Sequence, residues 1–322
     1  MIGIFDSGIG GLSVLVAIAR ALPQADLLYL ADTAHLPYGD KDDLFIRRRV
    51  LKIGRHLVDQ GCSVVVVACN TATAAAVAAF REAFPDTPVV GVEPGVKPAA
   101  AASKSGRIAV LATESTARSE RLARLIRLHA GNVQVDVEAC PGWATRVESL
   151  HLDDPDFAAE ARRHLAPLLA AGVDQIVLGC THYSFLSALL EPIVAGRAQL
   201  VDVADAVARQ CVRLVDPRTI GHAHLTLLAT AQAERLHIAL PKLGLNWLTP
   251  RLLKPAQLAV LSRTAPYRPA TTGMAGEWRK QALSGQVLCR TSTGAACRGG
   301  LFVPPSRWSA NQALEICTSN RR

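Results

Sequence analysis

Short hydrophobic runs alternate with longer amphipathic stretches over the first 247 residues of the chain. The runs are rich in valine, isoleucine and leucine, which is typical of parallel strands buried on both faces. They predict strands at residues 2–5, 27–30, 64–67, 89–92, 108–111, 133–137, 176–178 and 200–203. Between them, apolar residues recur at helical spacing and predict helices at residues 12–21, 44–57, 72–84, 119–129 and 157–171. This alternation indicates an α/β fold whose sheets are covered by helices.

One block of this pattern occurs twice. In the first copy, a helical stretch is followed by Gly61, a buried strand and Cys69. At a fixed offset, the same order gives Gly172, a buried strand and Cys180, and a polar pair follows each cysteine, Asn70-Thr71 and Thr181-His182. Because open α/β sheets bind ligands at the carboxyl ends of their strands, we expect both thiols at one ligand site. Two facing thiols can act on opposite sides of one carbon atom, which suggests a racemase.

The chain divides into two similar halves and a tail. A proline- and alanine-rich segment near residues 94–105 predicts the seam, and residues 2–7 share a pattern with residues 108–113. We expect two similar parallel-sheet α/β domains with the active site in the cleft between them. After about Thr249 the periodicity stops, so residues 250–322 are expected to form an irregular, disordered C-terminal tail. An interaction tail, a fusion or a shifted reading frame are the alternatives.

Length and composition narrow the class of protein. A chain of 322 residues has room for about two domains, and no run approaches the roughly 18 apolar residues of a membrane span. The amino terminus enters a strand directly, without the basic and apolar regions of a signal peptide. The eight cysteines lie at irregular spacings without paired CxxC motifs, which argues against a disulfide framework. We therefore expect a cytoplasmic protein with no membrane segment.

The net charge of +8 belongs to the end of the chain. Residues 250–322 hold 11 of the 35 Lys and Arg residues but only 2 of the 27 Asp and Glu residues, so the first 249 residues are close to neutral. A folded nucleic-acid binder usually gathers its basic residues on one face, and no such cluster precedes residue 250. No nucleic-acid partner is expected for the core.

Four short motifs occur in order: residues 6–12 (DSGIGGL), 37–39 (PYG), 69–72 (CNTA) and 179–183 (GCTHY). With the matched cysteines, they make the chain resemble the bacterial glutamate racemases, members of the cofactor-independent aspartate/glutamate racemase superfamily, over about residues 1–247. The resemblance implies a first domain at 1–95, completed by about 206–247, and a second domain at 96–205. It also implies glutamate as the substrate, no cofactor, and a role in supplying D-glutamate for peptidoglycan precursors. Two positions depart from the family pattern, Val203 and Ser184.

Inverting a stereocentre requires a proton to leave one face of the carbon and another to arrive at the opposite face. A single base cannot easily serve both faces, so two acid–base groups should flank the carbon. A cysteine suits this task when neighbours tune its pKa from the ordinary value of about 8.5. The resemblance assigns Cys69 and Cys180 as proton acceptor and donor, with Asp6 assisting Cys69 and His182 assisting Cys180.

Two carboxylates and an ammonium on the substrate call for neutral donors and backbone amides. On the resemblance, the substrate contacts are Asp6, Ser7, Tyr38, Gly39, Asn70, Thr71, Thr181 and His182, with Glu148, Thr113 and Thr116 as further candidates. The glycines at 8, 10 and 11 allow a tight turn into a helix whose amino end attracts anions. No Gly-Lys-Ser/Thr follows them, so this turn is not a nucleotide P-loop.

Simpler interpretations accompany several of these residues. A lone cysteine after an apolar run is usually a small buried hydrophobe, which is our expectation for Cys62, Cys140 and Cys211. Asp6 could merely cap the following helix. Cys69, Cys180 and His182 could ligate zinc, but no fourth ligand is evident and zinc would consume the thiolates, so no metal is expected.

Two functional alternatives to a glutamate racemase stay open at this stage. The nearest is an aspartate racemase or a related isomerase of the same superfamily. Another is a catalytically inactive binding or regulatory homologue. The oligomeric state is also open, with a homodimer as one expectation.

Overall fold

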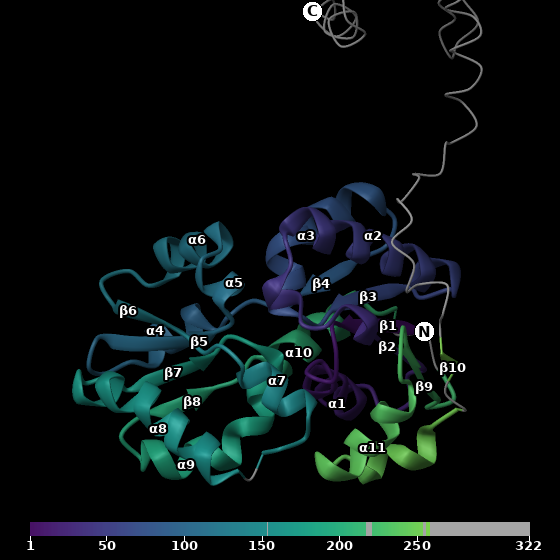
Figure 1. The fold of residues 1–322 in the computed structure, drawn as a ribbon. Helices are drawn as coiled ribbons and strands as arrows, with labels where there is room; N and C mark the ends of the chain where they lie inside the picture. The colour runs from purple at the N-terminus through teal and green to yellow at the C-terminus, as the bar shows by residue number, and fades with distance from the viewer. Residues whose placement is uncertain (153, 217–220, 254–255, 258–322) are drawn as a thin grey trace, which may run out of the picture. The chain divides into compact units, whose positions relative to one another are not determined.

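Two parallel sheets carry the fold of the computed structural model, which describes residues 1–152, 154–216, 221–253 and 256–257. The first sheet has the order β10-β9-β2-β1-β3-β4, and the second has the order β6-β5-β7-β8 (Figure 1). The first comprises β1 (Ile2–Asp6), β2 (Leu27–Ala31), β3 (Val64–Val67), β4 (Val89–Gly91), β9 (Leu225–Ala229) and β10 (Ala256–Gln257). The second comprises β5 (Arg107–Ala112), β6 (Gln134–Ala139), β7 (Gln175–Leu178) and β8 (Gln199–Val201).

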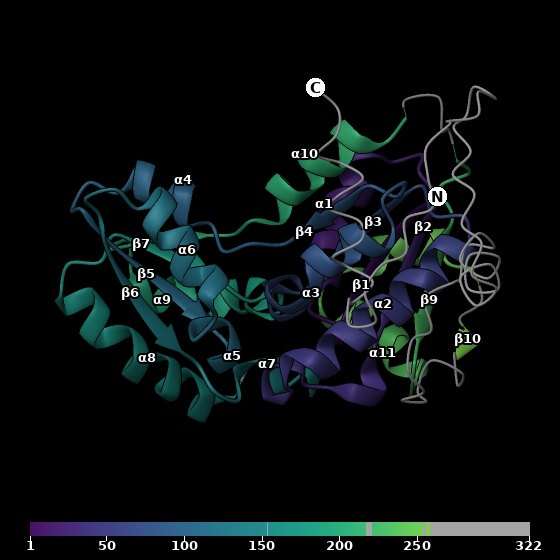
Figure 2. The same ribbon diagram turned by 90° about the horizontal axis from the view of Figure 1, so that it is seen from above.

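Helices follow most strands and cover both faces of each sheet (Figure 2). The longer helices are α1 (Leu12–Ala21), α2 (Asp43–Asp59), α3 (Asn70–Ala83), α6 (Glu120–His129), α8 (Pro155–Ala170), α9 (Ser187–Val194), α10 (Ala204–Leu214) and α11 (Glu234–Lys242). The shorter ones are α4 (Val96–Ala102), α5 (Glu114–Ala117), α7 (Trp143–Glu148), η1 (Thr33–His35), η2 (Tyr38–Asp40), η3 (Thr181–Leu186) and η4 (Asn246–Arg251). The α/β class with two parallel sheets is confirmed.

Alternate strand residues point to opposite faces of the first sheet and reach different helices. Ile4 and Val66 join the cluster that contains the apolar residues of α1, whereas Phe5 and Val67 join the cluster of α2 and α3. The second sheet does the same: Val110 packs with α4 and α6, and its other face packs with α8 and α9. Burial on both faces explains why these strands appear in the sequence as continuous apolar runs.

The repeated block has the same geometry in both copies. β1 lies between β2 and β3, and β5 lies between β6 and β7, so the two cysteine-bearing strands, β3 and β7, occupy matching places. Gly61 ends α2 with φ of 80°, and Gly172 ends α8 with φ of 87°. In both turns the glycine N–H and the following N–H bond back to the last turn of the helix, which closes a Schellman motif.

Several elements depart from the sequence prediction. The helices α9, α10 and α11 are absent from it. β9 is absent from the predicted strands, because a mostly apolar segment of five residues has no periodicity that separates strand from helix. Residues 96–102, inside the predicted seam, form α4 with Val96 and Ala99 buried. The strand predicted at 200–203 ends at Val201, and Val203 instead precedes α10 as its N-cap.

Residues 250–253 and 256–257, which the sequence analysis assigned to the tail, join the described fold. η4 runs through Arg251, whose guanidinium donates to the carbonyls of Ala223 and Ala25 at 2.7 and 2.8 Å. Leu252 bridges to Leu225, and β10 then pairs with β9. Residues 258–322 lie outside the described part of the chain. No described helix combines the length and apolarity that a bilayer span requires.

Candidate active site

Both matched cysteines open onto one cavity of about 460 Å³. Cys69 lies two residues after β3 and Cys180 two residues after β7, so each follows a strand of a different sheet. Their residues are 6% and 8% exposed, and both thiols are free. The expectation that the duplicated strand ends bring two thiols to one cavity therefore agrees with the geometry of the described residues.

Most of the predicted site residues line the same cavity. These are Ser7, Tyr38, Gly39, Asn70, Thr71, Thr113, Glu148, Thr181 and His182. Asp6 and Thr116 are buried behind it. Thr116 lies 3.3 Å from the Thr71 hydroxyl, so it supports a lining residue from outside the cavity.

Cys69 begins helix α3 and caps it with its own sulfur. The Ala72 N–H donates to Cys69 Sγ at 3.5 Å, and the thiol donates to the Ser7 hydroxyl at 4.0 Å. Burial raises the pKa of the Cys69 thiol well above its ordinary value, and the nearby Asp6 carboxylate raises it further. The environment of Cys69 thus favours the protonated thiol.

Asp6 closes the turn between β1 and α1. Its Oδ1 accepts the Ser7 N–H at 2.7 Å, and its Oδ2 accepts the N–H of Gly11, the N-cap of α1, at 2.5 Å. The Gly11 N–H at the amino end of α1 is therefore already bonded to a carboxylate of the protein. Burial raises the pKa of Asp6, against the opposing effect of His182.

Cys180 is paired with an imidazole that is fixed on its far side. Its Sγ lies 3.6 Å from His182 Nδ1, and His182 Nε2 lies 2.6 Å from Glu148 Oε1. Glu148 Oε1 also accepts the Ile9 N–H at 2.7 Å. Burial lowers the pKa of His182, but its hydrogen bonds to Cys180 and Glu148 outweigh burial and raise it well above the ordinary value. The environment of His182 thus favours the protonated imidazole.

The glycines after β1 make room for the relay formed by Cys180, His182 and Glu148. A Cβ added at Gly8 would lie 1.8 Å from Glu148 Oε1, and one at Gly10 would lie 2.4 Å from His182 Nδ1. Neither residue has a positive φ. The sequence interpretation attributed these glycines to a tight turn, whereas the structure requires them for close approach of the backbone to two side chains.

A buried polar network that the sequence interpretation missed holds Tyr38 at the cavity. Asp32 accepts from the Tyr38 hydroxyl at 2.6 Å and from Arg49 Nε and Nη2 at 2.8 and 2.7 Å. Thr230, which follows β9, donates to the same carboxylate at 2.8 Å. Asp32 directly follows β2, so the strand-end rule that singled out the cysteines would also have found it.

Other lining residues were also missed. They are Leu36, Pro37, Asp40, Glu114, Cys140, Pro141, Gly142, Ala144, Thr145, Ser149 and Arg235. Cys140 is buried, as expected of a small hydrophobe, yet it also faces the cavity. Arg235 comes from α11, far along the chain from any of the four motifs, and carries no local signal. Ser184, one of the two departures from the family pattern, lies in η3, where its carbonyl accepts the Ser187 hydroxyl at 2.9 Å.

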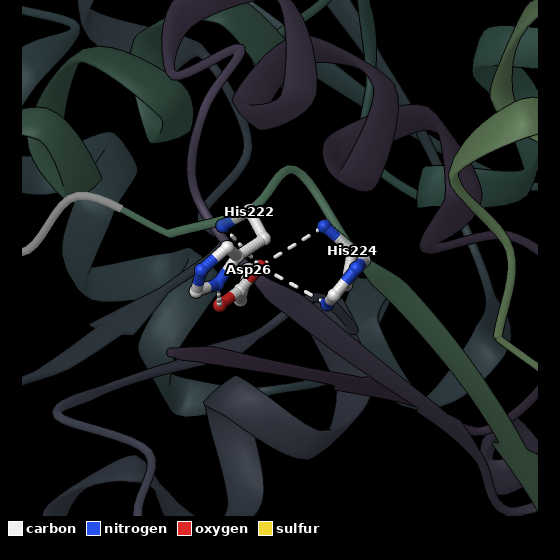
Figure 3. A group of neighbouring side chains, drawn as sticks. All are labelled: Asp26, His222 and His224. Carbon is white, nitrogen blue, oxygen red and sulfur yellow. Dashed lines mark hydrogen bonds and ion pairs between the residues drawn. The ribbon is translucent and has the colours of Figure 1, made fainter.

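A group of possible metal ligands lies away from this cavity. Asp26, His222 and His224 place their donor atoms within 4.8 Å of one another (Figure 3). Asp26 Oδ1 already accepts the backbone N–H groups of His222 and His224 at 2.8 and 2.9 Å. These bonds fix the chain entering β9 against the start of β2, which accounts for the clustering without a metal ion.

The sequence and the fold of this chain are similar to those of known racemases. The model of the Asp/Glu/hydantoin racemase family matches residues 7–211. Glutamate racemase of Pseudomonas aeruginosa is 47% identical over 232 residues, covering 72% of this chain and 85% of the relative. The structure of Escherichia coli glutamate racemase with L-glutamate and the activator UDP-MurNAc-Ala superposes with a TM-score of 0.70 at 32% identity, covering 80% of this chain and 97% of that one. Thermus thermophilus glutamate racemase with β-chloro-D-alanine gives 0.67 at 33% identity, covering 81% and 98%.

Proposed function

Because this chain belongs to the Asp/Glu/hydantoin racemase family, we propose that it interconverts L- and D-glutamate without a cofactor. The observation that carries the proposal is a pair of thiols after matching strands, both lining one cavity, with Asp6 near Cys69 and His182 near Cys180. In the cytoplasm, this activity supplies D-glutamate for peptidoglycan precursors, as the family membership implies.

The reaction transfers protons between two sulfur atoms and the α-carbon. In one direction, the Cys180 thiolate, stabilised by the His182 imidazolium, removes the α-proton and becomes a thiol. The Cys69 thiol then gives its proton to the opposite face and becomes a thiolate, near Asp6. The C–H bond that breaks is replaced by one of opposite configuration, and the two thiols have exchanged roles. The reverse reaction begins from that second state.

Polar side chains around the thiols are suited to hold the substrate. Asn70 is only 4% exposed and lines the cavity, yet its amide oxygen and nitrogen find no hydrogen-bond partner among the described residues. Buried polar atoms are normally satisfied. A carboxylate and an ammonium group would satisfy both atoms, which supports an amino acid as the ligand. Ser7, Thr71 and Thr181 offer further hydroxyls.

Circular dichroism of the purified protein tests the proposal. We expect racemisation of L-glutamate without added pyridoxal phosphate or metal, and unchanged activity after dialysis against a chelator. L-aspartate is the comparison substrate. Faster turnover of L-aspartate would make the protein an aspartate racemase, and no signal with either acid would make it a binding protein. Size-exclusion chromatography tests the further expectation of a homodimer.

A further inference from the structure

The charged side chains that line the cavity are mostly acidic. Asp40, Glu114 and Glu148 contribute carboxylates. The two ring nitrogens of His182 already pair with Cys180 and Glu148. Among the described lining residues, Arg235 contributes the one guanidinium or ammonium group. A substrate with two carboxylates and one ammonium is an anion. Glu148 and His182 pair with each other, so Asp40 and Glu114 are left to repel the substrate, and Arg235 attracts it.

Arg235 is held at the cavity by neutral partners. It lies in the first turn of α11, a helix anchored by the buried side chains of Leu236 and Leu240. Its Nη2 donates to the Glu148 carbonyl at 3.0 Å, and its Nη1 donates to Gln232 Oε1 at 3.2 Å. The Glu148 carbonyl lies at the carboxyl end of α7, where a cation is favourable.

Neither partner neutralises the guanidinium. Arg235 has five N–H donors, and these two bonds use two of them. The remaining donors can meet a carboxylate in the paired geometry that guanidinium groups favour. The Arg235 side chain is thus held in place, while its guanidinium charge has no acidic partner in these two bonds.

We propose that Arg235 is a specificity-determining residue that supplies the counter-charge for a carboxylate of the incoming substrate, an inference that rests on the proposed racemisation of glutamate. The side chain is exposed. An exposed charge attracts the substrate as it enters the cavity, and salt screens this attraction. Proton transfer occurs at the two buried thiols. Arg235 therefore governs the apparent affinity for substrate and leaves the chemical step to the cysteines.

Racemisation kinetics of Arg235→Gln and Arg235→Lys test this role. Lys242→Gln is the matched control, because it removes the same charge from the exposed end of the same helix but does not line the cavity. For Arg235→Gln we expect KM for glutamate to rise about fivefold with kcat within about twofold of the wild type. Arg235→Lys should recover most of the loss, and Lys242→Gln should match the wild type.

Salt dependence separates a charge effect from a packing effect. Between about 0.01 M and about 0.3 M salt, kcat/KM of the wild type should fall, and that of Arg235→Gln should fall much less. An unchanged KM in Arg235→Gln, an equal fall in Lys242→Gln, or a loss confined to kcat would overturn the proposal. Failure of the wild type to turn over glutamate would instead refute the proposed function itself, so the two failures are distinct.

Discussion

The two thiols occupy matching places but have chemically different neighbours. Cys69 meets a carboxyl group and a hydroxyl, from Asp6 and Ser7, whereas Cys180 meets an imidazole, from His182. The Cys69 setting raises the pKa of its thiol and favours the neutral form. The two thiols therefore differ in their neighbours, although the backbone that carries them is duplicated.

Replacing either thiol tests the proposed two-base mechanism. We expect Cys69→Ser and Cys180→Ser to lower full racemisation at least about 100-fold, because a serine hydroxyl is a much weaker acid than a thiol. Cys62→Ala is the control, since Cys62 is buried beside Gly3 and does not line the cavity. Circular dichroism from each enantiomer measures the rates. Near-native turnover by either serine variant would exclude that cysteine from proton transfer.

The raised pKa of His182 predicts a pH-dependent contribution to stability. Because the folded-state pKa lies above the unfolded value of about 6.5, the imidazolium–Glu148 pair stabilises the fold fully below that pH. The contribution is lost as pH rises through the folded-state pKa. Urea unfolding at pH 6 and pH 9 gives the free energy of unfolding of the wild type and of Glu148→Gln. The difference between the two proteins should be smaller at pH 9 than at pH 6 by at least about 1 kcal/mol. A difference that grows with pH would contradict this sign.

At the scale of elements, the turn from β1 into α1 serves the relay on the other sheet. Gly8 and Gly10 let its backbone approach Glu148 and His182, and the Ile9 N–H donates a hydrogen bond to the Glu148 carboxylate. One turn thus shapes the surroundings of Cys180 as well as those of Cys69. Glycine is required at positions 8 and 10 because Glu148 and His182, more than 130 positions away in the sequence, leave no room for a Cβ atom.

A methyl group at Gly10 should therefore damage catalysis. We expect Gly10→Ala to displace the His182 ring and to lower kcat at least about tenfold, because misplaced catalytic groups lose rate steeply. Gly61→Ala is the contrasting variant. Gly61 has a positive φ but open space around its Cα, so the substitution should cost about 1 kcal/mol of stability and leave kcat unchanged. Equal kcat values for the two variants would count against the relay.

The sequence was most informative where local pattern decides structure. Valine-rich runs located eight of the strands, and matched strand ends located Cys69 and Cys180, because burial on both faces and connection at a sheet edge leave local signatures. β9 and Arg235 were missed because their places depend on contacts with segments about 200 and about 90 positions away. Asp32 directly follows β2, so the same strand-end rule applies to it.

At the scale of the whole molecule, the last described segment belongs to the first sheet. β9 pairs with β2, β10 pairs with β9, and Arg251 bonds to the carbonyls of Ala25 and Ala223, which precede β2 and β9. The chain therefore returns, after completing the second sheet, to finish the first. The division into two domains at residues 95 and 205 stays a prediction, because contacts join the described residues in one compact unit.

Truncation distinguishes this junction from the rest of the C-terminal region. A chain ending at Gln257 should retain full activity, because every described cavity residue precedes that point. A chain ending at Thr249 loses the bonds of Arg251 and the bridge of Leu252, and its unfolding free energy should fall by about 2 kcal/mol. Thermal unfolding and racemisation assays measure both. An inactive but folded chain 1–257 would show that later residues contribute to the reaction.

Glu148 bonds at once to the β1–α1 turn and to the imidazole beside Cys180, and this shared anchor has a consequence for the active site. Displacement of the turn from α7 would break the bond from the Ile9 N–H, which helps to fix the carboxylate that orients His182. The geometry of the imidazole beside Cys180 therefore depends on a turn that follows a strand of the other sheet.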